Sequence, residues 1–175
     1  MPKYAVFLRG VNVGGRIVKM AELKTCLEKA GLDNVQTLLQ SGNAVFESSK
    51  KEPVLKSLIE QTLTKTFNYP AKVQVVSLVR LERLIKDYPF GAAGPKQHNY
   101  IIFMENHLEK SALKDEYELG AGEKVQAGDG VIYWRVDQGK TLRSSFGKLL
   151  SKSKYRQFNT NRNLNTLMKI IASGQ

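Results

Sequence analysis

The chain has 175 residues, 42% of them hydrophobic, which is enough to bury the core of one domain or of two small subdomains. Its apolar runs are far shorter than the roughly 20 residues that cross a bilayer, and its first residues lack the features of a signal peptide. A single cysteine excludes an internal disulfide. We therefore expect a globular cytoplasmic protein with no membrane partner.

The formal net charge is +11 and is unevenly distributed along the chain. Residues 141–175 contain seven Lys and Arg residues and no Asp or Glu. A basic surface of this kind attracts polyanions such as nucleic acid. It also serves simply as a solvated surface that keeps a protein soluble, and composition leaves both interpretations open.

Hydrophobic periodicity in the first half predicts a βαββαβ order of elements. Gly31 ends the first helix, Ser41-Gly42 is a turn signal between two strands, and Pro53 opens the second helix. The predicted elements are a strand at 3–9, a helix at 19–31, strands at 35–40 and 43–48, a helix from 53 to about 67, and a strand at 72–79.

The second half repeats this order as βαββα. It begins with a short connecting helix at 81–88 and a Gly/Pro loop, and it closes with a helix from about Asn163, without a clear last strand. The repetition predicts an α+β fold of two ferredoxin-like (alpha-beta plait) subdomains in tandem, residues 1–78 and 79–175. The other predicted elements are a strand at 99–104, a helix at 108–119, a hairpin at 123–136 and a helix at 142–150.

Connection handedness predicts which loops are neighbours in the first subdomain. A right-handed crossover makes the first two strands parallel, and the hairpin then makes the third antiparallel to the second. The loop "RGVNVGGR" (9–16) and the turn "QSGN" (40–43) should therefore lie at the same edge of the sheet, together with the loop "FNYPAK" (67–72).

Three segments, "YAVFLRGVNVGG", "LQSGNAVF" and "NTNRNLNTLMKI", together resemble the signature segments of the uncharacterised family called domain of unknown function 1697. The resemblance covers the whole chain. It implies a tandem plait-like α+β fold and a bacterial cytosolic setting, with no established activity to carry over. In the last motif Asn161 departs from the usual residue, and Leu164 replaces a common tryptophan and so loses its stacking surface.

The opening loop is the first candidate ligand site. It lacks the spacing of a P-loop or of a dinucleotide-binding fingerprint, but its glycines permit close backbone approach to an anion. The alternative is a wide turn that sets the strand-to-helix angle, with Asn12 satisfying local main-chain groups. The candidate ligand-binding residues of this loop are Arg9, Asn12, Gly14 and Gly15.

The turn between the second and third predicted strands is the second candidate. Ser41, Gly42 and Asn43 are ordinary turn residues and need no ligand. Their predicted closeness to Arg9 and Asn12 favours a shared ligand, because a hydroxyl and an amide would then face the same group.

The final helix is the third candidate, because helical spacing separates an apolar face from a polar one. Arg162 is expected beside the helix N-terminus, where the helix dipole disfavours a cation and stabilises a bound anion. The alternative is an amphipathic helix with solvated charges. The candidate ligand-binding residues here are Arg162, Asn163, Thr166 and Lys169.

Residues for catalysis are scarce. His98 and His107 are expected at the surface, and neither has a neighbouring ligand at metal-binding spacing, so we expect no metal and no cofactor. Cys26 shares a helix face with apolar residues and is expected in the core. Whether the protein is an enzyme stays open.

The leading hypothesis is therefore a protein that binds a phosphate-bearing ligand, a nucleotide or nucleic acid, in a composite polar site made of the three candidates. One alternative is a small enzyme acting on an anionic or phosphorylated metabolite. Another is a structural or oligomeric protein whose motifs join the two subdomains. The expected partners are an anionic small molecule or nucleic acid, and a homo-oligomer is compatible with each hypothesis.

Overall fold

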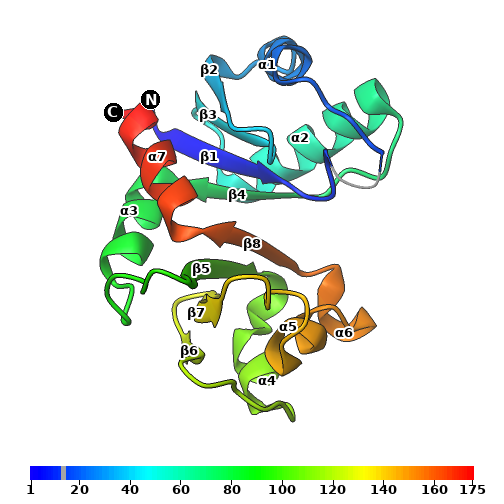
Figure 1. Cartoon of the computed structure of the whole chain (residues 1–175). Coiled ribbons are helices and arrows are strands. Elements are labelled where there is room, and N and C mark those ends of the chain that lie inside the picture. The colour runs from blue at the N-terminus through cyan, green and yellow to red at the C-terminus, as the bar shows by residue number, and fades with distance from the viewer. Residues whose placement is uncertain (13–14) are drawn as a thin grey trace. The chain divides into compact units, whose positions relative to one another are not determined.

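The computed structural model describes residues 1–12 and 15–175 and contains two four-stranded antiparallel sheets, each with helices (Figure 1). The residues pack as two units, Met1–Arg83 with Lys169–Gln175, and Leu84–Met168. Helix α7 (Leu164–Gly174) begins in the second unit and ends in the first. The division into domains of residues 1–78 and 79–175 stays a prediction.

The first unit contains every strand and helix predicted for it, with ends shifted by a few residues. Its sheet has the strand order β2-β3-β1-β4. The elements are β1 (Lys3–Leu8), α1 (Met20–Lys29), β2 (Asp33–Leu38), β3 (Asn43–Glu47), α2 (Glu52–Phe67), β4 (Val73–Ser77) and α3 (Leu78–Lys86), of which α3 continues into the second unit.

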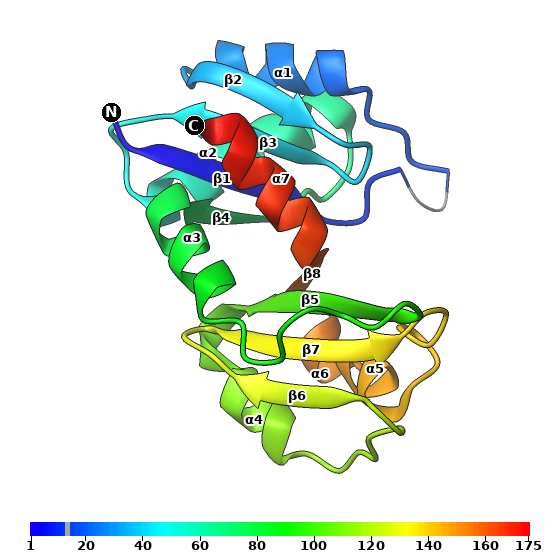
Figure 2. The same ribbon diagram turned by 60° about the vertical axis from the view of Figure 1, so that its left-hand side comes forward.

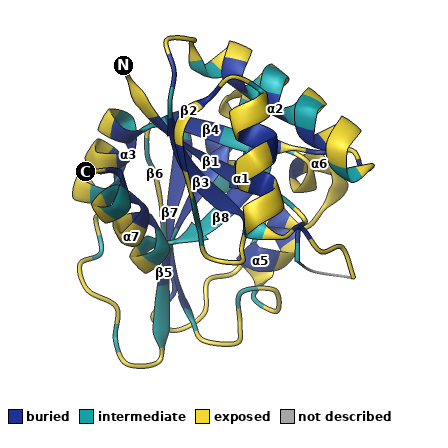
Figure 3. Ribbon diagram, turned by 90° about the horizontal axis from the view of Figure 1, so that it is seen from above, coloured by how far each residue is buried: buried dark blue, intermediate teal, exposed yellow. Residues whose placement is uncertain are grey.

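Strand β1 is the centre of the first unit. It pairs antiparallel with β3 and with β4, so that Ala5 lies opposite both Val45 and Val76. Alternate side chains from β1, among them Val6 and Leu8, pack into a core with α1 and α2. β1, β3 and β4 are mostly buried beneath these helices, whose outer faces are exposed (Figure 3). Ala5 and Phe7, on the other face of β1, are fully buried as well, which explains why β1 is apolar on both alternating faces.

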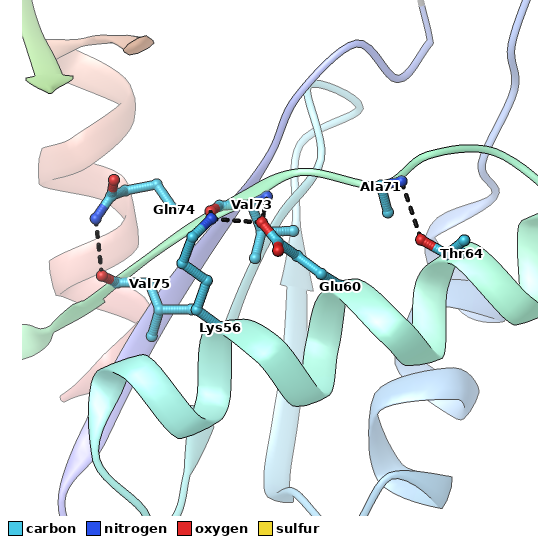
Figure 4. Close-up of polar contacts among 7 residues, drawn as sticks. All are labelled: Lys56, Glu60, Thr64, Ala71, Val73, Gln74 and Val75. Atoms are coloured by element: carbon cyan, nitrogen blue, oxygen red, sulfur yellow. Dashed lines mark hydrogen bonds and ion pairs between the residues drawn. The ribbon is translucent and has the colours of Figure 1, made fainter. Parts of the chain in front are cut away.

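Helix α2 covers the outer edge of β4, which is the last strand of the sheet that the described residues form and pairs with β1 on its other edge. Glu60 accepts a hydrogen bond from the Val73 N–H at 3.1 Å, and Lys56 donates to the Val73 carbonyl at 2.8 Å and also pairs with Glu60 (Figure 4). Residues four apart share one helix face, which is why a single stripe reaches along the strand. The stripe consists of Glu52, Lys56, Glu60 and Thr64, whose partners are Ser77, Val73, Val73 and Ala71.

The sheet of the second unit has the strand order β6-β7-β5-β8, and α4, α5 and α6 lie on one of its faces (Figure 2). The core between them is rich in aromatic side chains, with the Trp134 ring 5.5 Å from that of Phe146. The elements are β5 (Gln97–Met104), η1 (Glu105–His107), α4 (Glu109–Lys114), β6 (Lys124–Ala127), β7 (Val131–Asp137), α5 (Ser145–Leu150), α6 (Ser153–Arg156) and β8 (Asn159–Asn163).

Strand β8 was not predicted from the sequence. Its residues, "NTNRN", are all polar and give no apolar alternation, so the sequence predicts no last strand before the helix that starts at about Asn163. It pairs antiparallel with β5, and Arg162 lies opposite Ile101. Arg162 is therefore a strand residue, and it lies two positions before α7 begins at Leu164, beside the helix N-terminus as expected.

Replacing Glu60 with Ala should lower the free energy of unfolding by about 1–3 kcal/mol, because the Val73 N–H loses its acceptor and the Lys56 ammonium loses its ion-pair partner while it keeps the Val73 carbonyl. Glu60→Gln keeps one acceptor oxygen and should cost less. Chemical denaturation measures both variants. The exposed residue Gln61 of the same helix is the control, and Gln61→Ala should change stability by less than about 0.5 kcal/mol. Equal effects of Glu60→Ala and Gln61→Ala would contradict this role for the stripe.

Candidate functional site

Three loops of the first unit meet at one edge of its sheet, as the crossover geometry predicts. The N–H of Leu8 donates to the Gly42 carbonyl at 2.8 Å, and the N–H of Arg9 donates to the Lys72 carbonyl at 3.1 Å. The opening loop is thus tied both to the β2–β3 turn and to the loop before β4. We call this surface the loop edge and define it as residues 9–12, 15–19, 38–43 and 68–72.

Asn12 ties two parts of the loop edge together. Its backbone adopts a left-handed conformation, with φ of 57°. Its side-chain oxygen accepts from the Val18 N–H at 3.0 Å, and its side-chain nitrogen donates to the Gln40 carbonyl. Both ends of the carboxamide are engaged with main-chain groups. These contacts fit the alternative in which Asn12 satisfies the local backbone of a wide turn.

The β2–β3 turn is held by its own residues. Asn43 is fully buried and donates from Nδ2 to the Leu38 carbonyl at 3.1 Å and to Ser41 Oγ at 2.8 Å. Gly42 has a φ of 82°, and a Cβ there would lie 2.6 Å from Cγ2 of Val11. Glycine is thus required at 42 by conformation and by close packing.

The loop edge contains cations and no carboxylates. Its sequence includes Arg9, Arg16, Lys19 and Lys72 and neither Asp nor Glu. The Arg16 guanidinium lies 4.6 Å from the centroid of the Tyr69 ring, a cation–π distance. Burial raises the pKa of Tyr69, and the positive charge of Arg16 opposes that rise. The predicted Gly14 lies outside the described residues, whereas Gly15 is exposed with a φ of 84°.

The remaining predicted residues lie on β8 and α7. Burial lowers the pKa of the Arg162 guanidinium to about 10, so it stays charged at neutral pH, and its Nη1 donates to the Asn161 carbonyl at 3.0 Å. Asn163 ends β8. Thr166 is half-buried on α7, and Lys169 is exposed in the part of α7 that belongs to the first unit.

The second unit contains a hollow of about 550 Å³ that the sequence did not predict. Only Asn163 of its lining was among the candidate residues. The polar run "QHN" that opens β5 lines the hollow and was the available sequence signal for it. Polar residues at a strand end are too common, however, to indicate a site by themselves. The lining consists of Ile85, Tyr88, Gly91, Ala92, Ala93, Gln97, His98, Asn99, Asn163, Leu164, Asn165 and Met168.

Arg135 of β7 holds the loop that forms one wall of this hollow. Its Nε donates to Oδ1 of Asn99 at 2.9 Å. Its Nη2 lies 2.8 to 2.9 Å from three successive carbonyl oxygens, and Nδ2 of Asn99 donates to one of them at 2.9 Å. These carbonyls belong to Phe90, Gly91 and Ala92. A buried guanidinium thus fixes a Gly/Ala segment that has few side chains to hold it.

Part of the basic C-terminal block is neutralised within the second unit. Asp115 accepts hydrogen bonds from the Tyr155 hydroxyl and, at 3.2 Å, from Lys154. The Tyr155 hydrogen bond, followed by that of Lys154, holds the pKa of the Asp115 carboxyl below its ordinary value. Lys154 therefore has a structural partner and is a weak candidate for polyanion binding.

Within residues 1–12 and 15–175, no group of three or more His, Cys, Asp and Glu side chains is arranged to hold a metal ion. Cys26 is buried, as expected for a core residue. None of the helices in the described part of the chain has the length and apolar character needed to cross a membrane.

These features define a mixed α/β protein with two four-stranded antiparallel sheets, each with helices. The family model described as "Protein of unknown function (DUF1697)" matches residues 1–133, and the chain belongs to this family. The conserved bacterial protein SP0830 from Streptococcus pneumoniae has a similar structure, with 25% sequence identity, a TM-score of 0.82 and 99% of each chain covered. No curated protein matches the chain.

Gly42→Ala should destabilise the protein more than Gly15→Ala. Both residues have a positive φ, which costs an L-residue roughly 1–2 kcal/mol. Only at Gly42 would the new Cβ also overlap Val11, since no atom lies within 4 Å of a Cβ built at Gly15. Thermal unfolding of the two variants tests this ranking. An equal or smaller loss for Gly42→Ala would refute the close packing assigned to the turn.

The Asp115 contacts predict a pH-dependent stability. A carboxyl whose pKa is lowered by folding stabilises the protein above its unfolded pKa, and this contribution disappears as pH falls through the folded pKa. The melting temperature of wild type should therefore be higher than that of Asp115→Asn at neutral pH. This difference in melting temperature, the gap, should shrink below about pH 4, where an Asp carboxyl ordinarily titrates. Melting curves from neutral to acidic pH measure the gap. A gap that stays constant down to the lowest pH would refute the assigned ion pair.

Proposed function

We propose that the chain binds a phosphate-bearing ligand, a nucleotide or a nucleic acid segment, at the loop edge of its first unit. The observation that carries the proposal is the meeting of three loops with four Lys and Arg residues and no Asp or Glu. Cations gathered on loops whose own sequence has no carboxylate attract phosphate through long-range electrostatics and charge-assisted hydrogen bonds.

The backbone of the loop edge supports the same function. Gly10 and Gly15 both have positive φ, at 64° and 84°, and both are exposed, so a ligand can approach the main chain closely there. Arginines bind phosphate bidentately, whereas Lys19 and Lys72 act as exposed point charges. Ser41 is exposed at the same edge and offers a hydroxyl.

The structural alternative is favoured for part of the predicted set. Asn12, Gly42 and Asn43 are engaged in holding the loops, so we assign them the role of shaping the loop edge. Arg9, Gly15 and Ser41 are kept as ligand contacts, and Arg16, Lys19 and Lys72 are added to them. Arg162, Asn163 and Thr166 belong to the second unit and are not used in this proposal.

Several broader expectations accompany the proposal. The strand orders β2-β3-β1-β4 and β6-β7-β5-β8, each with a βαββαβ succession, support the classification of both units as ferredoxin-like. The similar protein from Streptococcus pneumoniae supports a bacterial origin. A cytoplasmic setting and a homo-oligomer remain predictions.

Lys72→Ala should weaken the binding of polyanions. Fluorescence anisotropy with a labelled oligothymidylate over a salt series measures log Kobs against log[salt], and losing one phosphate contact should flatten the slope by about 0.7. ATP and heparin, tested as competitors, distinguish a nucleotide site from a general polyanion surface. Arg9→Ala should weaken binding as well. A melting curve of this variant shows whether it is still folded.

Lys29→Ala is the matched control, because Lys29 is an exposed lysine of the same unit at the far end of α1. It removes the same charge from the protein without touching the loop edge, so its slope should equal that of wild type. The proposal fails if no probe binds at low salt, or if Lys72→Ala and Lys29→Ala weaken binding equally.

A further inference from the structure

The hollow of the second unit has a chemical character quite different from that of the loop edge. None of the residues lining it is Lys, Arg, Asp or Glu. Its walls include the apolar side chains of Ile85, Leu164 and Met168 and the ring of Tyr88. The Tyr88 hydroxyl is engaged, since it donates to the Trp134 carbonyl at 3.0 Å. An occupant that fits this lining is uncharged and has an apolar face.

A chain of hydrogen bonds selects one tautomer of the neutral His98 ring at the rim of the hollow. The backbone N–H of Asn165 can only donate, and it donates to Oδ1 of Asn163 at 2.9 Å. Nδ2 of Asn163 therefore faces Nδ1 of His98, at 3.4 Å. An amide nitrogen can only donate, so Nδ1 must accept and the proton of the neutral ring resides on Nε2.

Two polar groups of the lining are left available. Within the described part of the chain, Nε2 of His98 and the side-chain carboxamide of Asn165 make no hydrogen bond. The first is a donor, and the second offers both a donor and an acceptor. By contrast, the carboxamide of Asn99 is occupied at both ends by Arg135 and by Gly91. The hollow therefore presents a small, mixed hydrogen-bonding edge beside an apolar wall.

The walls of the hollow are held by hydrogen bonds within the second unit. Arg135 clamps the Gly91–Ala92 wall through backbone carbonyls, and Asn163 fixes the start of α7 on the other side. Pre-formed walls reduce the entropy lost on binding. The volume of about 550 Å³ falls in the range of roughly 300–1,000 Å³ typical of small-molecule sites.

We propose that this hollow binds a nucleobase, as the base of a nucleoside or nucleotide. A base is planar and uncharged, with apolar faces and an edge that carries both donors and acceptors. Carboxamides pair with such edges, and aromatic and apolar side chains contact the faces. In this assignment Tyr88, Leu164 and Met168 contact the ring faces, while His98 Nε2–H and Asn165 hydrogen-bond the edge.

This site is independent of the loop edge, since a nucleoside has no phosphate. The test titrates the four ribonucleosides into the ¹⁵N-labelled full-length chain at millimolar concentration and follows the side-chain amide of Asn165 and the backbone amides of the hollow. Saturable shifts confined to the hollow, insensitive to salt, are expected. Ribose and inorganic phosphate, titrated in parallel, should leave these signals unmoved.

Two variants test the geometry. Asn165→Leu removes the available carboxamide, and Ala93→Phe fills the hollow from an exposed position whose carbonyl Arg135 does not use. Each should raise Kd for the nucleoside at least tenfold while the melting temperature stays near that of wild type. Gln61→Leu, which removes an exposed carboxamide from a helix of the first unit, should leave Kd unchanged.

Absence of nucleoside binding at millimolar concentration would overturn the inference. So would binding that both hollow variants retain, or equal responses to ribose and to nucleosides. A requirement for phosphate would also overturn it, because an uncharged lining offers phosphate no partner. Loss of polyanion binding at the loop edge would leave this result untouched.

Discussion

The central position of β1 is the constraint on which the loop edge depends. Because β1 pairs antiparallel with both β3 and β4, its C-terminal end must lie beside the start of both neighbours. The opening loop, the β2–β3 turn and the loop before β4 are therefore brought together by strand pairing alone. The contacts of Asn12 and Gly42 then fix the loops. The Lys and Arg residues of these loops therefore lie on one surface.

The second sheet has the same strand order but uses its loops differently. Its central strand β5 opens with polar residues, and the segment before it is held by Arg135 through backbone carbonyls. The result is an uncharged hollow in place of a basic edge. Repetition of one strand order has thus produced two surfaces with different chemistry, one basic and the other uncharged.

Much of the fold could be predicted because buried strands and amphipathic helices leave a periodic apolar signal. β8 could not, since "NTNRN" has no apolar residue and its strand conformation is imposed by pairing with β5. For the loop edge, handedness was enough to predict which loops meet, and the structure confirms it. The hollow escaped prediction because Arg135 acts on main-chain carbonyls more than 40 positions away, and no side-chain pattern records such a contact.

The central claim is that strand pairing gathers an acid-free set of cations that binds phosphate. Its most direct test is a ¹⁵N–¹H titration of the protein with inorganic pyrophosphate at low salt. The account predicts saturable shifts of the amides of Gly10, Gly15, Ser41 and Lys72, with the amides of the uncharged hollow unmoved. Shifts spread evenly over all exposed lysines, or none at the loop edge, would contradict it.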